Sequence, residues 1–83
     1  LERILKALAN GRRIAILKFI KKSDSASVGE IADAIKLSFK ATSKHLTILF
    51  SANILDKEQI SLTMLYFLPK ENHPIVSKLL SIL

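Results

Sequence analysis

Residues 27–50 read SVGEIADAIKLSFKATSKHLTILF, and they contain two helical patterns separated by a short turn. Ser27 and Glu30 have the spacing of a capping box, in which each side chain satisfies a backbone N–H of the other residue. We expect a first helix to begin after Ser27 and to end near Lys36. Ser38 is expected to cap a second helix that is polar at its start and apolar further on. Two short helices joined by a tight turn make a helix-turn-helix, whose second helix can enter the major groove of DNA.

Two further helices are expected before this motif. Apolar side chains at helical spacing predict helices over residues 1–8 and 11–21, and Asn10 can cap the second of them. Residues 23–27, rich in serine, are expected to form a loop.

A β-hairpin and a last helix are expected after the motif. Asn53 suits the left-handed end of a helix, and residues 54–58 and 62–68 then read as two strands. Pro74 is expected to begin the final helix. The expected fold class is therefore mainly α with a small β-hairpin, a winged helix-turn-helix of order α-α-α-α-β-β-α, in a single domain over residues 1–83.

The composition is that of a basic globular chain without cysteine. Of the 83 residues, 13 are Lys or Arg and 7 are Asp or Glu, which gives a net charge of +6. Seven of the cations lie in the first 22 positions, where only Glu2 opposes them. This charge favours a polyanionic partner, most often a nucleic acid. The absence of cysteine excludes disulfides and thiolate metal sites.

The apolar segments are short. None approaches the roughly 18–20 residues that a membrane-spanning helix needs, and none near the N-terminus resembles a signal peptide. We therefore expect a cytoplasmic protein with no membrane partner. The chain starts with Leu1 instead of an initiator Met, so we expect it to be part of a longer protein.

Three groups of residues follow one another in an order shared with a known family. They are Ile4–Asn10 with Arg12–Leu17, Glu30–Ile35 with Leu37 and Ser38, and Ser43–Leu46 with Leu49 and Asn53–Leu55. This order resembles ArsR-like (arsenic-repressor type) winged-helix regulators over almost the whole chain. The resemblance implies a homodimeric transcriptional repressor that dimerises through its first and last helices and binds double-stranded operator DNA with paired recognition helices.

The helix that begins after Ser38 is expected to present a cationic face without acids. Side chains three and four residues apart share one face of a helix. The DNA-binding residues expected from this helix are Ser38, Phe39, Lys40, Ser43, Lys44, His45 and Thr47. The lysines would reach guanine edges or phosphates, the hydroxyl groups phosphates, and Phe39 a thymine methyl group. The competing interpretation is that the lysines only solvate a surface helix and that Phe39 packs on a neighbouring loop.

Three more cations complete the expected DNA-binding set. Arg12 and Arg13 open the second helix, and the resemblance implies that this end lies near the DNA backbone. Lys57 is the one cation of the hairpin, although the flanking acids Asp56 and Glu58 would repel phosphate.

The terminal helices carry more apolar side chains than a small core should bury. The expected dimer interface consists of Leu1, Ile4, Leu5, Leu8, Ile75, Leu79, Leu80 and Leu83. Pairing these helices across a two-fold axis would set two recognition helices about 34–36 Å apart, one turn of DNA. The second strand is also apolar on both faces, so we expect the C-terminal helix, or else a partner, to cover it.

Some positions depart from the pattern of that family. Lys36 stands at the helix-turn-helix turn, where the family usually has glycine, and a left-handed Lys costs roughly 1–2 kcal/mol more. Ser27 and Gly29 occupy the positions of the family's thiolate sensor, so no metal or other cofactor is expected. The wing tip, residues 59–62, lacks the usual Gly and Arg, which weakens the case for contact between the wing and DNA.

An enzymatic function is not expected. The two His residues are isolated, no carboxylate pair is placed for acid–base chemistry, and no glycine-rich phosphate loop is present. The favoured function is a sequence-specific DNA-binding transcriptional regulator, a homodimeric repressor on a near-palindromic operator. The alternative is a winged-helix module for protein–protein interaction within a larger assembly, which the apolar, acid-flanked hairpin favours.

Overall fold

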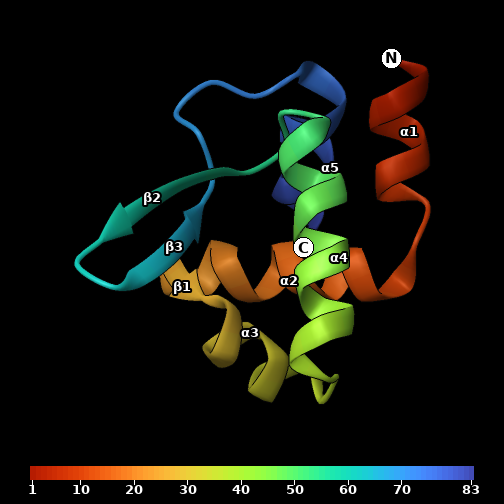
Figure 1. Ribbon diagram of the computed structural model, residues 1–83. Coiled ribbons are helices and arrows are strands. Elements are labelled where there is room, and N and C mark those ends of the chain that lie inside the picture. The colour runs from red at the N-terminus through yellow and green to blue at the C-terminus, as the bar shows by residue number, and fades with distance from the viewer.

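The computed structural model describes residues 1–83, with five helices and a three-stranded antiparallel sheet (Figure 1). The elements are α1 (Glu2–Leu8), α2 (Gly11–Ser23), β1 (Ser25–Ser27), α3 (Val28–Ile35), α4 (Phe39–Ser51), β2 (Asp56–Ile60), β3 (Thr63–Phe67) and α5 (Pro74–Ile82). The prediction of a winged helix-turn-helix is confirmed. None of the five helices has the length and the apolar character that spanning a bilayer requires.

Side-chain caps start the helices at the predicted places. The Asn10 side chain accepts a hydrogen bond from the backbone N–H of Arg13 at the start of α2. Ser27 and Glu30 form the complete capping box of α3. The Ser38 hydroxyl accepts from the N–H of Ala41, 3.1 Å away, at the start of α4. These caps satisfy donors that have no partner within their own helix, and so they fix where the helix-turn-helix begins and turns.

Three helix ends have a positive φ: Asp24 after α2, with φ 69°, and the two positions singled out in the sequence. Lys36 ends α3 with φ 56° and ψ 51°, and Asn53 follows α4 with φ 61°. Asn tolerates this geometry because its short polar side chain bonds locally, whereas Lys has no such compensation. Both positions agree with the sequence-based expectations.

The serine-rich segment expected as a loop contains a strand, and the prediction is wrong there. β1 pairs with β3, placing Ser25 opposite Phe67 and Ser27 opposite Leu65. β3 is therefore the central strand of a sheet with the order β1-β3-β2. Three residues carry too little alternation to predict a strand, and β1 exists because the free edge of β3 supplies its backbone hydrogen bonds.

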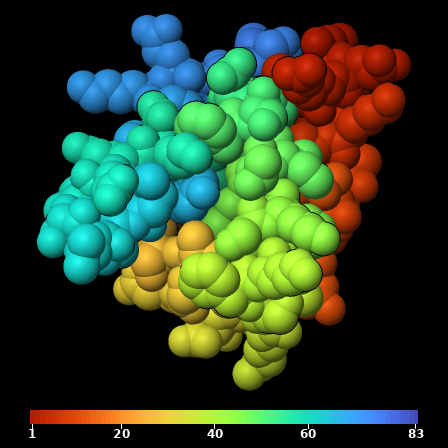
Figure 2. Space-filling model, viewed as in Figure 1, coloured from red at the N-terminus to blue at the C-terminus, as the bar shows by residue number.

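The hairpin is shifted along the sequence relative to its prediction. Its first strand was expected over residues 54–58, but Ile54 and Leu55 are buried in the core and β2 begins only at Asp56. Every residue of β2 is exposed. A two-residue turn, Ser61-Leu62, joins it to β3. The hairpin projects from the helices as a wing (Figures 1 and 2).

The expectation that α5 covers the second strand is also wrong. α2 and α3 pack against β3, and Tyr66 of β3 is buried there. α5 packs instead against α2. As the middle strand, β3 has a neighbour strand at each edge and helices on one face. This accounts for the apolar side chains on the covered face only.

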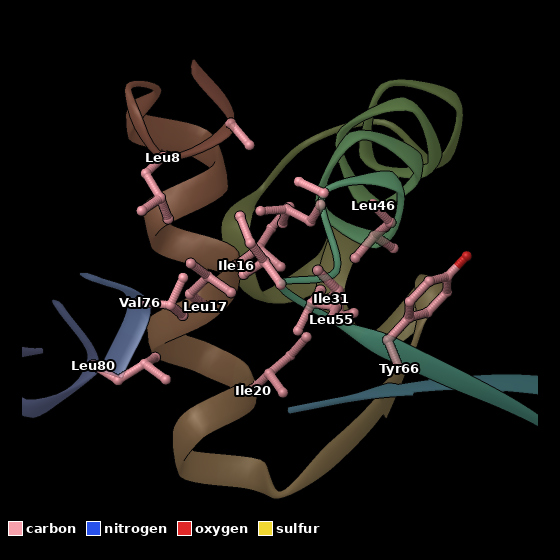
Figure 3. Packing of buried hydrophobic residues seen from close by; sticks show 14 of the residues in the cluster. Leu8, Ile16, Leu17, Ile20, Ile31, Leu46, Leu55, Tyr66, Val76 and Leu80 are labelled. Carbon is pink, nitrogen blue, oxygen red and sulfur yellow. The ribbon is translucent and has the colours of Figure 1, made fainter. Parts of the chain in front are cut away.

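The core surrounds α2, whose Ile16, Leu17 and Ile20 are completely buried. Figure 3 shows Leu8 of α1 and Leu80 of α5 on one side of α2, with side chains of α4 and the sheet on the other. Leu8 and Leu80 are 8% and 9% exposed within the single chain. These two residues are therefore part of the chain's own core and leave little surface for a partner, and their place in a dimer interface stays a prediction.

Candidate nucleic-acid interface

α4 presents one open face to solvent. It crosses the visible surface between α1 on one side and the wing on the other (Figure 2). Its inward residues Thr42, Leu46 and Leu49 are fully buried, which fixes the rotation of the helix. A shallow hollow follows its outward side and is lined by Phe39, Lys40, Ser43, Lys44, Thr47 and Ile48. The structure therefore brings together five of the residues predicted for this face, and no acid lines the hollow.

The lysines and hydroxyl groups of this face differ in whether they already have a hydrogen-bond partner within the protein. Lys40 and Lys44 are exposed. The Ser38 hydroxyl oxygen already accepts from Ala41, but its O–H remains free to donate. The Thr47 hydroxyl donates to the carbonyl oxygen of Ser43 at 3.0 Å. Thr47 was expected to donate to a phosphate, and in this structure its proton is used inside the helix instead.

Arg13 is engaged within the protein and does not extend from the helix end. Its Nε donates to the carbonyl oxygen of Ala7 at 2.6 Å, and Nη2 donates to that of Lys6 at 3.2 Å. Its Nη1 lies 3.2 Å from Nδ1 of His45 on α4. These three bonds tie the end of α1 and the start of α2 to α4. Arg13 therefore has a structural role in this chain, and its contact with DNA stays a prediction.

His45 is partly buried, as expected, and acts as the acceptor for Arg13. Partial burial lowers the pKa of His45 below its usual 6.5, and the positive charges of Arg13 and then Arg12 lower it further. The ring is therefore neutral near pH 7, with Nδ1 accepting and the proton on Nε2. Arg13 occupies Nδ1, so Nε2–H is the one donor that the neutral ring has left, and contact of His45 with a phosphate stays a prediction.

The other two predicted cations lie apart from the hollow. Arg12 is exposed, and its Nη1 donates to the carbonyl oxygen of Ile35 at 3.5 Å, which places the guanidinium beside the end of α3. The ammonium group of Lys57 lies 4.4 Å from the centre of the Phe50 ring. This cation–π contact holds Lys57 near the base of the wing, beside α4. The wing tip therefore carries no cation.

Two cations that sequence reasoning missed lie beside α4. Arg3 and Lys6 of α1 line a second hollow together with Ile48 of α4. Nη1 of Arg3 also donates to the carbonyl oxygen of Ser51 at 3.4 Å. In the sequence these cations only mark the polar side of α1, and nothing there indicates which helix that side approaches.

No group of three or more His, Asp or Glu side chains is placed to hold a metal ion.

Comparison with known proteins places the chain among bacterial regulators. Residues 10–57 match the family described as "bacterial regulatory protein, arsR family". The HTH-type transcriptional regulator YgaV of Escherichia coli (strain K12) is 31% identical over 68 residues, which cover 82% of this chain and 69% of YgaV.

Solved structures agree in fold over nearly the whole chain. The transcriptional regulator HlyU from Vibrio vulnificus CMCP6 is 30% identical, with a TM-score of 0.81 over 98% of this chain and 80% of that protein. The homodimeric winged helix-turn-helix DNA-binding domain of Mb0332 from Mycobacterium bovis is 27% identical, with a TM-score of 0.82 over 98% of this chain and 71% of that domain. These similarities support a regulator and give no support to the alternative of a protein-interaction module.

Proposed function

Since the chain belongs to the ArsR family of bacterial regulatory proteins and is a DNA-binding transcriptional regulator, we propose that it represses transcription as a homodimer on a near-palindromic operator. The observation that carries this proposal is the acid-free, cationic outer face of α4. A face with exposed lysines and no acid suits the negative potential of a DNA groove. Such a protein acts in the cytoplasm, where bacterial DNA is found.

The geometry of α4 suggests how it would hold DNA. Its N-terminal end has unpaired backbone N–H groups and the positive end of the helix dipole, which attract phosphate. The free O–H of Ser38 can donate to a phosphate of the DNA backbone at the same end of the helix. Lys40 and Lys44 lie one helical turn apart. With α4 in the major groove, their ammonium groups would reach guanine edges on the floor of the groove or phosphates along its sides.

Exposed apolar residues at both ends of the chain support a dimer. Leu1 and Leu5 of the N-terminal segment are 66% and 46% exposed, and Ile82 at the end of α5 is 72% exposed. Ile4, Ile75, Leu79 and Leu83 are partly buried and belong to the same proposed interface. The Mb0332 domain, with the same fold, is itself homodimeric. A dimer with two helices in adjacent major grooves would exclude RNA polymerase from an overlapping promoter, which is the basis for proposing repression.

The test begins with selection of bound sites from a random duplex library, followed by affinity measurements on the selected duplex by fluorescence anisotropy. We expect a near-palindromic site. Lys40→Ala combined with Lys44→Ala should weaken binding at least tenfold. The slope of log affinity against log salt concentration should become shallower by about 0.9 for each phosphate that the variant no longer neutralises.

The matched control is Lys22→Ala combined with Lys70→Ala, which removes the same charge from exposed positions outside α4 and outside the terminal helices. We expect this pair to retain most of the affinity. Equal losses in both variants would show that only overall charge matters, and unchanged binding in the α4 variant would reject α4 as the recognition helix.

A further inference from the structure

Phe39 is an exposed aromatic residue on an otherwise polar part of α4. It is the first residue of the helix, and 63% of its surface is exposed. It lies next to Lys40 at the N-terminal end of the α4 hollow. It also borders a separate hollow that is shared with Val28 of α3 and with Leu62 and Met64 of the wing. The ring therefore stands between the recognition helix and the wing and is not packed away on a loop.

An aromatic ring at this position has few partners on DNA. The first residues of a recognition helix contact base edges in the major groove. Phenylalanine has no donor or acceptor, so it cannot read the hydrogen-bonding groups of the bases. The 5-methyl group of thymine is the apolar feature that the major groove offers.

We infer that Phe39 is a specificity-determining residue that recognises a T·A pair in each half-site through the thymine methyl group. The inference rests on the proposed function, because it requires α4 to lie in the major groove. Contact would remove the exposed ring face and the methyl group from water together. Leu62 and Met64, on the wing side of the ring, would extend the apolar surroundings of that contact.

The second exposed apolar residue of the α4 hollow provides an internal comparison. Ile48 is 43% exposed and lies nine positions after Phe39. At about 1.5 Å of rise per residue, the two side chains are about 13 Å apart along the helix, so they cannot contact the same methyl group.

The experiment uses the selected duplex and versions of it in which each thymine is replaced in turn by deoxyuridine. This replacement removes the methyl group and leaves the base-pairing groups unchanged. Each half-site should contain one thymine whose replacement matters. Replacing it in one half-site should lower the affinity about three- to fourfold, as for exposing one methyl group, and replacing it in both half-sites should lower it about tenfold. In the Phe39→Ala variant, the affinities for thymine and deoxyuridine at that position should become equal. Phe39→Leu should retain part of the difference, and Ile48→Ala should retain all of it.

The outcomes separate this inference from the proposed function. If no duplex is selected, or if α4 substitutions do not affect binding, the proposed function fails and this inference with it. If a palindromic site is selected but deoxyuridine is tolerated at every position, only the role of Phe39 is rejected. The same holds if Phe39→Ala preserves the preference for thymine. Circular dichroism and thermal unfolding of the Phe39→Ala variant serve as the control for folding, and we expect both to match those of the unsubstituted protein.

Discussion

At the scale of single residues, Lys36 carries a conformational cost at the centre of the DNA-binding motif. It closes α3 in a left-handed conformation, where the side chain of any L-residue crowds the backbone. Lys36→Gly should therefore raise the free energy of unfolding by about 0.5–1 kcal/mol, after allowance for the greater freedom of Gly in the unfolded chain. Urea unfolding measures this change.

A control variant separates backbone geometry from charge at the same position. Lys36→Ala removes the ammonium group but keeps the unfavourable left-handed geometry, so its stability should not rise. If Ala stabilises the protein as much as Gly does, repulsion among the neighbouring lysines is the cause.

The residue scale is also where sequence reasoning was most reliable. Asn10, Ser27 and Ser38 cap the helices that they were predicted to cap, because capping depends on side chains within three residues of the cap. The roles of Arg13 and His45 could not be read in the same way. Their bond joins residues 32 positions apart, and only the packing of α2 on α4 brings them together.

At the scale of elements, this Arg13–His45 bond connects the α1–α2 corner to the recognition helix and makes that connection sensitive to pH. The folded protein holds the pKa of His45 below 6.5, whereas the unfolded chain binds the proton near its usual pKa. Between these two values the unfolded state binds more protons. The free energy of unfolding should therefore fall as the pH is lowered from about 6.5 through the folded-state pKa, and it should recover above that range.

Urea unfolding at a series of pH values tests this dependence. His45→Asn keeps an acceptor near the position of Nδ1 but does not titrate, so its stability should vary less with pH over the same window. Equal pH dependence in the two proteins would assign the effect to other ionisable groups.

Element boundaries in the sheet were less predictable than the helices for a physical reason. The helices carry periodic apolar faces and local caps, so their own sequence locates them. β1 is three residues long and is specified by β3, a segment about 40 residues away in the chain. Ile54 and Leu55 resemble strand residues because they are apolar, but it is the core that buries them and not the sheet. For this reason the sequence indicated a wing but misplaced the start of β2, and it did not predict β1.

At the scale of the whole molecule, the apolar surface divides into the part that the chain covers itself and the part that it leaves exposed. Of the eight residues predicted for a dimer interface, Leu8 and Leu80 are in the core, whereas Leu1 and Leu5 remain exposed. Sequence periodicity shows that a helix has an apolar face, but it does not show whether the chain or a second copy covers that face. Exposed apolar side chains lie at both ends of the chain, at Leu1, Leu5 and Ile82, and also on α4 and the wing tip. The group at the chain ends is the one that supports self-association through the terminal helices.

Leu5→Gln combined with Ile82→Gln should weaken this association without changing the net charge. We expect the dimer dissociation constant, measured by sedimentation equilibrium, to rise at least tenfold, because two apolar side chains per protomer lose their burial at about 1.5–3 kcal/mol each. Affinity for the palindromic duplex should fall as well, since each half-site would then be bound separately. Ile60→Gln combined with Leu62→Gln removes two exposed apolar side chains from the wing tip and should leave the dimer intact. If the wing-tip pair dissociates the dimer and the terminal pair does not, the protomers associate through the wing, and the spacing of the recognition helices must be set by that contact instead.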